Sequence, residues 1–186
     1  CGVRFVPVRR TLHIGIFSTG DELTEAERPL EPGEVRDCNR PMLSAALRRL
    51  QVKPVDYGVV RDDAEQLAQV LAQAVRECDA VLLSGGSSMG QRDYAAQTIA
   101  QMGPPGLLAH GLAIKPGRPT IIGQAGNKPI VGLPGHPAAA MTVFYLIVEP
   151  IIRRLRGEKK QVMAVVPARL ARNVASSPGR DDFISV

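Results

Sequence analysis

The sequence predicts an α/β fold, a three-layer arrangement in which a mostly parallel sheet carries helices on both faces. Three observations support this prediction. Short segments rich in β-branched residues alternate with segments whose apolar residues recur every three or four positions. The order is strand, helix, strand, helix, strand, helix. Repeats of this kind build parallel sheets whose crossover helices cover both faces.

Turn-forming residues bound each predicted strand. The first three strands are predicted at residues 11–17, 52–60 and 79–84, and a later pair at 119–124 and 128–134. Residues 125–127, Ala-Gly-Asn, separate the later pair, and a short turn of this composition favours an antiparallel hairpin.

The predicted helices are placed by their caps and apolar faces. Asp37 or Asn39 can cap the first helix and Pro41 suits its opening turn, while Asp62 or Asp63 can cap the second. The inward faces are Leu43, Ala46, Leu47 and Leu50 in the first helix, and Leu67, Val70, Leu71, Ala74 and Val75 in the second.

Two further helices are expected. A short one follows Asp93, with Ala96, Ile99 and Ala100 facing inward. A long apolar one runs from His136 to Leu155, and Pro150 inside it should kink or break it. Its buried candidates are Met141, Phe144, Tyr145, Val148 and Ile152.

We expect three parts along the chain. Residues 1–10 are the linker of a missing N-terminal region, residues 11–157 form the α/β domain, and residues 158–186 belong to a partial C-terminal β domain. In that last part, residues 161–174 are predicted as β structure, and a further strand should start at residue 183. So short a β segment is marginal alone, so it should lean on the main domain.

Composition limits the function classes. The chain has 186 residues, of which 45% are hydrophobic, and no apolar run approaches the roughly 20 residues of a membrane-spanning helix. No secretory leader is visible. Cys1, Cys38 and Cys78 form neither a disulfide framework nor a metal cluster, which favours a reducing cytoplasm. The net charge of +5 is scattered except at residues 153–160, and aromatic residues are only 4%, so we expect no nucleic-acid or membrane partner.

The loops after the predicted strands carry the candidate chemistry, because ligands bind at the carboxyl ends of strands in open α/β sheets. After the third strand, glycines allow close backbone approach, serines supply hydroxyl donors, and a helix start offers free N–H groups. These residues are Gly85, Gly86 and Gly90 with Ser84, Ser87 and Ser88. The loop suits a phosphate or oxyanion, and it matches neither a Walker loop nor GxGxxG. The alternative is a tight turn without a ligand.

Glu22, Asp62 and Asp93 each lie just past the end of a different predicted strand. Carboxylates around an anion site are expected where Mg²⁺ bridges them to phosphate oxygens. Alternatively, Asp62 and Asp93 are only helix caps. Lys115 and Arg118 flank a Pro-Gly turn and together suit an oxyanion, unless they are simply solvated surface charges.

Five motifs, in order and with similar gaps, resemble the molybdenum insertases, the family of bacterial MoeA and the gephyrin E domain. They are FSTGDEL (17–23), RDD (61–63), SGGSSMGxxDY (84–94), AIKPGRP (113–119) and GLPGHP (132–137). The resemblance covers about residues 9–157, and SPGRDDF (177–183) is similar to a motif of the family's C-terminal β domain.

The resemblance implies an enzyme that binds adenylated molybdopterin, takes molybdate and releases AMP in a Mg²⁺-dependent reaction, usually as a homodimer. The adenylyltransferase of the same pathway is a further expected partner. By position, Glu22, Asp62 and Asp93 match essential acidic residues and metal ligands, and Lys115 matches a lysine of the anion site. The motifs place ligand contacts at Ser18, Thr19, Gly20, Asp21, Ser84, Gly85, Gly86, Ser87, Ser88, Gly90, Arg118, Pro134, Gly135 and Pro137.

The chain departs from the family pattern at five positions. Ser87 stands where Val is common, His136 where Asn is, and Ala139 where Ser often follows. Gly111 replaces a common basic residue, and Ser185 an Arg. The departures leave the carboxylates and the adenylate loop intact but remove side chains that are expected to contact molybdate. The resemblance therefore supports pterin-adenylate binding more strongly than efficient insertion.

Two alternatives stay open. A molybdopterin adenylyltransferase attaches AMP rather than removing it, and it would carry a GGTG-type loop, although Arg92-Asp93 is shared with its pattern. A non-catalytic pterin-binding scaffold or sensor would keep the fold without the chemistry. ATP consumption would identify the first, and binding without turnover the second.

Overall fold

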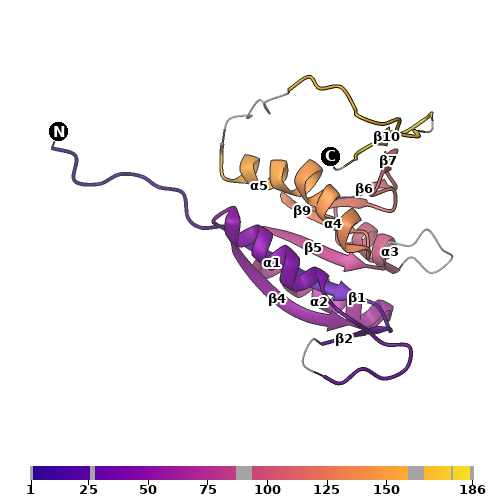
Figure 1. Ribbon diagram of the computed structural model, residues 1–186. Helices are drawn as coiled ribbons and strands as arrows, with labels where there is room; N and C mark the ends of the chain where they lie inside the picture. Colours follow the sequence, from indigo (N-terminus) through magenta and orange to yellow (C-terminus); the bar gives the residue numbers. More distant parts are fainter. Residues whose placement is uncertain (1, 26–27, 87–93, 159–165, 177, 185–186) are drawn as a thin grey trace.

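The computed structural model describes residues 2–25, 28–86, 94–158, 166–176 and 178–184. A six-stranded sheet lies at its centre in the order β4-β1-β5-β9-β8-β6 (Figure 1). The strands are β1 (His13–Thr19), β4 (Lys53–Val60), β5 (Ala80–Gly85), β6 (Pro105–His110), β8 (Ile121–Ala125) and β9 (Lys128–Leu133). Strands β4, β1, β5 and β9 run parallel, whereas β8 is antiparallel to both of its neighbours. The predicted α/β class and the predicted hairpin are confirmed.

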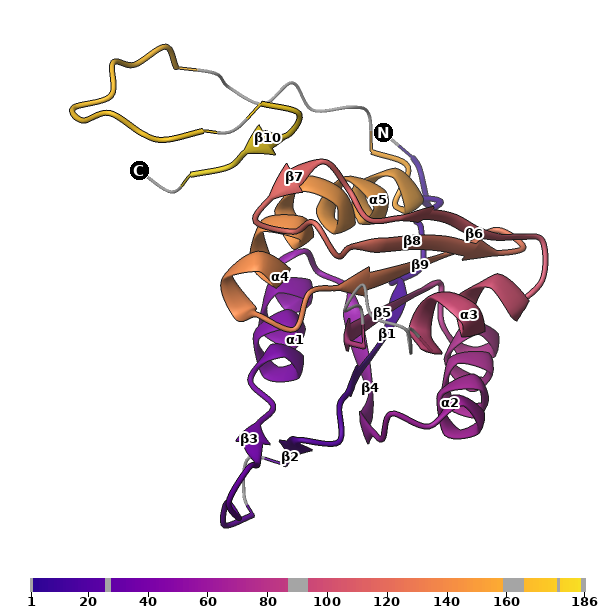
Figure 2. The same ribbon diagram turned by 90° about the vertical axis from the view of Figure 1, so that its right-hand side faces the viewer.

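Helices cover both faces of the sheet, as Figure 2 shows. Helix α1 (Asn39–Arg49) lies on one face with α4 (Pro137–Val143) and α5 (Glu149–Leu155). Helices α2 (Ala64–Glu77) and α3 (Tyr94–Gln101) lie on the other. Alternate residues of β1 and β5 supply the two apolar cores, because successive side chains of a strand point to opposite faces. No helix of the described chain is long and apolar enough to cross a membrane.

The structure decides between the alternative helix caps. Asp63 caps α2, since its Oδ1 accepts the backbone N–H of Gln66 at 2.8 Å. Asp62 is therefore not the cap of α2. In α1 neither predicted residue occupies the N-cap position, which is Cys38 and makes no side-chain cap bond. The Oδ1 of Asp37, one residue earlier, accepts the backbone N–H groups of Asn39 and Arg40 at 3.0 and 3.3 Å.

The long C-terminal helix is continuous rather than broken at Pro150. A π-helical segment, η1 (Phe144–Val148), joins α4 to α5, and Pro150 falls in the first turn of α5. Proline removes one N–H and crowds the preceding turn, and a wider π turn accommodates both effects. The sequence predicts a buried Tyr145, but this side chain is 47% exposed. Neighbouring helical residues point about 100° apart, so Tyr145 turns away while Phe144 packs inward.

Other sequence predictions were wrong in detail. Ala100 is exposed, and Ala95 takes the inward position on α3 beside Ala96 and Ile99. The sequence pattern also fails to predict edge strand β6. Two short sheets complete the fold: β2 (Leu23–Thr24) pairs with β3 (Val35–Arg36), and β7 (Ile114–Lys115) with β10 (Asp181–Asp182).

The C-terminal segment does lean on the main domain, through the β7–β10 pair. Of the predicted β segment at 161–174, residues 161–165 lie outside the described residues, and residues 166–174 form no strand, contrary to the prediction. The last strand lies at residues 181–182 rather than starting at 183. Strands need a neighbour for their backbone groups. The described chain offers one to residues 181–182, where β7 is available, and none to residues 166–176.

Arg40 is a buried cation that joins α1 to its surroundings. Its side chain is 8% exposed and pairs with Asp37 at 2.5 Å, Asp56 at 2.8 Å and Glu25 at 2.5 Å. Burial alone would lower the pKa of Arg40, but its hydrogen bonds to Asp37, Asp56 and Glu25 outweigh burial and raise it. The guanidinium therefore stays charged.

Replacing Arg40 by Met is expected to lower the free energy of unfolding by about 3 kcal/mol, because the Asp37 carboxylate, 2% exposed, loses its counter-charge. Urea unfolding measures the change. Arg48→Met, at an exposed position of the same helix, should cost under about 0.5 kcal/mol. Adding Asp37→Asn to the Arg40 variant should recover part of the loss, and no recovery would contradict the buried-charge explanation.

Candidate functional site

The order of the strands creates a crevice at one edge of the sheet. The chain leaves β1 towards α1 on one face, and after β5 it enters α3 on the opposite face. Connections that diverge in this way open a ligand site at the carboxyl ends of the two strands. Figure 2 shows α1 and α3 on opposite sides of the sheet. The crevice lies where the sequence placed the candidate loops.

A pocket of about 330 Å³ occupies this edge. The loops after β1, β5 and β9 contribute to it together with the β2–β3 segment and the start of α1. Its lining residues are Thr19, Glu22, Leu23, Val35, Arg36, Asp37, Cys38, Asn39, Ser84, Gly85, Gly135, His136 and Pro137. We call it the carboxyl-edge pocket.

The main chains of β1 and β5 touch at the pocket. Gly85 and Gly86 have φ values of +89° and +60°. A Cβ on Gly85 would lie 2.2 Å from the carbonyl oxygen of Thr19, and one on Gly86 would lie 2.7 Å from the Thr19 methyl group. Only glycine fits both the positive φ and the close contact. The predicted reason for these glycines, close backbone approach, is therefore present, although the partner in the structure is β1.

The loops after β1 and β4 are joined by acidic residues. The Thr19 hydroxyl donates to Oδ1 of Asp62 at 2.7 Å, and the backbone N–H of Asp62 donates to Oδ1 of Asp21 at 3.2 Å. The Glu22 carboxylate folds back beside Gly20, with Oε2 2.9 Å from the position of a Cβ on that glycine. Hydrogen bonds thus connect Asp21 and Asp62, whereas Glu22 lies beside Gly20 and lines the pocket; all three residues are exposed.

Several predicted site residues lie outside the described residues, namely Asp93, Ser87, Ser88 and Gly90. Within the described ranges, no group of three or more His, Cys, Asp or Glu side chains could hold a metal ion. Mg²⁺ commonly binds through one or two carboxylates plus substrate phosphates rather than in an all-protein cage. The carboxylates of Asp62 and Glu22 fit that mode of binding.

Lys115 and Arg118 line a different pocket, of about 690 Å³, which shares no lining residue with the carboxyl-edge pocket. Both side chains are exposed. Their loop lies at the same end of the sheet, because Ile121, where β8 begins, pairs with Gly132 near the end of β9. Pairing of β10 with β7 brings Arg180 into the lining. Three cationic residues therefore line this second pocket.

The remaining predicted positions differ in exposure. Ser18, Thr19 and Ser84 are buried, at 1%, 2% and 1% exposed. Gly20 and Pro134 are also buried, whereas Gly135 and Pro137 are exposed. The departures His136 and Gly111 line the carboxyl-edge and second pockets respectively, and Ser185 lies outside the described residues.

Sequence reasoning missed Asn39 as a site residue and considered it only as a cap. Its Nδ2 donates to the Ser84 hydroxyl at 2.6 Å and to the Gly135 carbonyl at 2.8 Å. One side chain thereby joins α1, β5 and the loop after β9. The available signal was a polar residue just before an apolar helical stripe, which could not reveal partners 45 and 96 positions away.

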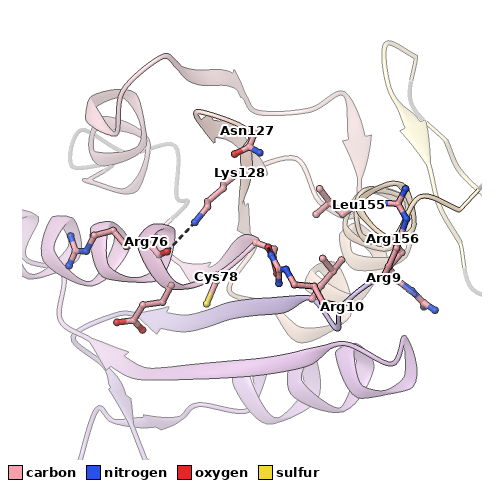
Figure 3. A pocket seen from close by; sticks show the side chains of 11 residues that line it. Arg9, Arg10, Arg76, Cys78, Asn127, Lys128, Leu155 and Arg156 are labelled. Carbon is pink, nitrogen blue, oxygen red and sulfur yellow. Dashed lines mark hydrogen bonds and ion pairs between the residues drawn. The ribbon is translucent and has the colours of Figure 1, made fainter. Parts of the chain in front are cut away.

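Figure 3 shows a further pocket, of about 570 Å³, between the start of β1, the end of α2 and the end of α5. Three of its cationic side chains already have partners. Arg10 pairs with Asp79, Lys128 Nζ donates to the Val75 carbonyl at 2.5 Å, and Arg156 donates to the Leu50 carbonyl at 2.7 Å. These contacts hold the fold together at the amino ends of the strands, away from the predicted loops.

Asp79 makes the fold sensitive to acid. Burial alone would raise its pKa, but bonds from the Arg10 guanidinium and the His13 backbone N–H outweigh burial and lower it. A lowered pKa means that the folded state favours the charged carboxylate. Its stabilisation is complete above the unfolded-state pKa and is lost as pH falls through the folded-state pKa. Asp79→Asn should therefore flatten the fall in melting temperature below about pH 4. Glu31→Gln, at an exposed carboxylate outside these contacts, serves as the control and should not change that fall.

Comparison with known proteins gives the family. Residues 15–154 match the family described as "Probable molybdopterin binding domain". The chain belongs to this family. The motif resemblance is confirmed by relatives and solved structures of MoeA-type proteins.

A molybdopterin molybdenumtransferase of Haemophilus influenzae is 33% identical over 98% of this chain and 45% of its own length. One from Nostoc is 35% identical over 83% of this chain and 36% of its own length. The chain thus spans less than half the length of these curated relatives.

Solved structures agree with the family. A MoeA molybdopterin biosynthesis protein from Pyrococcus horikoshii has a TM-score of 0.72 at 38% identity, covering 80% of this chain and 36% of its own. The tungsten cofactor synthesizing protein MoaB from Pyrococcus furiosus has a TM-score of 0.60 at 20% identity, covering 82% of this chain and all of its own. The second likeness shows the fold alone.

Proposed function

We propose that this molybdopterin-binding domain is the pterin-adenylate-binding part of a molybdenum insertase, which places molybdate on adenylated molybdopterin and releases AMP. The main supporting observation is the carboxyl-edge pocket, where Thr19, whose hydroxyl donates to Asp62, lies against the glycine backbone of β5. The two relatives named molybdopterin molybdenumtransferase match 98% and 83% of this chain, which supports the proposal. Because they extend well beyond the matched region, activity is assigned to the longest form of the protein.

In the proposed reaction, four residues of the pocket region have a physical role. Gly85 and Gly86 carry no side chain that would keep a phosphate from the main chain. Asp62, held by the Thr19 hydroxyl, and Glu22 would hold Mg²⁺ together with phosphate oxygens. Bound there, Mg²⁺ would neutralise charge on the phosphate during release of AMP.

The second pocket is the proposed molybdate side. Lys115 and Arg118 supply cationic donors to an oxyanion, and Arg180 from the C-terminal segment lines the same pocket. Ala139, on the first turns of α4, has no hydroxyl to add. We expect weaker molybdate binding than in relatives that carry Ser at this position.

The setting of the enzyme is also proposed. The exposed apolar side chains of Leu108 and Tyr145 support a homodimer, and the pathway's adenylyltransferase is the proposed source of substrate. Cys38, exposed, and Cys78, buried, are free thiols, which supports a reducing cytoplasm. Sedimentation would test the dimer.

The deciding experiment mixes the longest form of the protein with adenylated molybdopterin and Mg²⁺, with and without molybdate, and quantifies AMP by chromatography. Lys115→Ala should abolish the molybdate-dependent part of AMP release. Lys53→Ala, an exposed lysine at the start of β4 on the opposite end of the sheet, should leave it unchanged. Tight adenylate binding without AMP release would instead support a non-catalytic pterin-binding module, the alternative favoured by Ala139. Consumption of ATP would support the adenylyltransferase.

A further inference from the structure

Three buried polar residues lie together under the start of α1. Ser18 on β1 and Ser84 on β5 are direct neighbours in the parallel register, and each is 1% exposed. They follow Ile16 and Leu82 by two positions and so face the same core as those residues, on the α1 side. Asn39, 6% exposed, lies at the start of α1 and donates to the Ser84 hydroxyl. We call these three residues the polar floor.

The polar floor is only partly satisfied. The Asn39 amide orientation is fixed, because its Nδ2 faces the Gly135 carbonyl, which accepts hydrogen bonds and cannot donate them. Its Oδ1 is buried and has no hydrogen-bond partner among the described residues, and neither has Oγ of Ser18. Buried polar atoms without partners cost stability, so native structures keep few of them. Both atoms lie at the carboxyl ends of β1 and β5, where Asn39 and Ser84 line the carboxyl-edge pocket.

The Asn39 oxygen limits which ligand groups fit here, whereas the Ser18 hydroxyl can both donate and accept a hydrogen bond. A carboxamide oxygen only accepts hydrogen bonds, so phosphate or molybdate oxygens have nothing to offer it. The complementary group is an N–H or O–H, such as the amino or ring N–H of a pterin or purine. One bridging water can carry such a contact to an atom buried this deeply.

We propose that Asn39 is the positioning residue of the pocket. It holds the loop after β9 against β5, and with the Ser18 hydroxyl it receives a neutral N–H donor edge of the bound pterin or purine, directly or through one water. This inference rests on the proposed function. It adds two residues that recognise the heterocycle of the substrate rather than its phosphates.

The first test is Ser18→Ala, which removes a hydroxyl that has no hydrogen-bond partner among the described residues. The melting temperature should stay the same or rise, because no described bond is lost. The affinity for adenylated molybdopterin, measured by calorimetry, should nevertheless fall about tenfold, since a lost hydrogen bond is worth about that factor. A purely structural serine would give neither result. Ser44→Ala, a buried serine within α1 rather than at the carboxyl end of a strand, should not change affinity.

The second test is Asn39→Asp, which keeps the shape but places a carboxylate against the Gly135 carbonyl. Relative to the unchanged protein, affinity should fall about 100-fold at pH 8 and recover partly at pH 5, where a neutral carboxyl again donates one hydrogen bond. If the unchanged protein binds the adenylate and both variants bind equally well, this inference is overturned alone. If the unchanged protein binds no adenylated molybdopterin, both this inference and the proposed function are overturned.

Discussion

Replacing Asp62 by Asn is expected to lower AMP release about 100-fold or more, with little change in the melting temperature, because the amide oxygen can still accept the hydrogen bond from the Thr19 hydroxyl. Asp62 is exposed, its carboxylate accepts a hydrogen bond from the Thr19 hydroxyl, and its backbone N–H donates to Asp21, so the carboxylate lies at the edge of the pocket rather than in the core. Removing one preorganised electrostatic group from an active site commonly costs a factor of about 100 to 1,000. The assay is AMP release at saturating adenylated molybdopterin and Mg²⁺.

The adjacent carboxylate is the matched control. Asp63 caps α2 through the Gln66 N–H, so Asp63→Ala should cost about 1 kcal/mol of stability and leave turnover within about twofold. The two variants differ by one position in the chain and should separate activity from stability. Equal loss of activity in both would contradict the division of roles between these two residues.

Replacing Gly85 by Ala is expected to destabilise the fold by about 4 kcal/mol or more, or to prevent folding. A Cβ at this position would lie 2.2 Å from the Thr19 carbonyl oxygen, and the φ of +89° is strained for any side chain. The obstacle is the backbone of β1, which cannot rotate away. Urea unfolding or, failing expression, the soluble yield measures the effect.

Gly126→Ala separates the two causes. Gly126 has a φ of +58° in the β8–β9 turn, and a Cβ added there would have no described atom within 4 Å. This variant should lose about 1–2 kcal/mol from backbone strain alone. A Gly85 variant no less stable than the Gly126 variant would show that β1 and β5 can separate at the pocket, contrary to their contact in the structure.

Local patterns predicted most of the scaffold. Runs of β-branched residues placed β1, β4 and β5, and apolar periodicity placed α1 and α2, because both signals depend only on nearby residues. Edge strand β6 was not predicted from the sequence. Its first residues, Pro105 and Gly106, are typical of a turn, and its pairing with β8 joins residues far apart in the sequence. At residues 166–176 the opposite error occurred, because a strand was predicted where none forms. Strand-like composition without a neighbouring strand does not form β structure.

The candidate loops followed from the sequence for a topological reason. Parallel strands end at one edge of a sheet, so the residues after β1, β4 and β5 had to converge there. Nothing local could tell Asp62 from Asp63, and each suits a helix cap equally well in sequence. The three-dimensional structure assigns the cap to Asp63 and joins Asp62 to Thr19 of another strand.

The sequence by itself determined the fold class, the family and the edge of the sheet where the chemistry lies, since these depend on periodicity and on motifs within short stretches. Tertiary structure alone decided that Lys115 and Asp62 lie at different parts of that edge and that Asn39 joins Ser84 to Gly135. Such contacts depend on strand order and on hydrogen bonds between residues tens of positions apart. A local sequence pattern does not show which residues far apart in the chain come into contact.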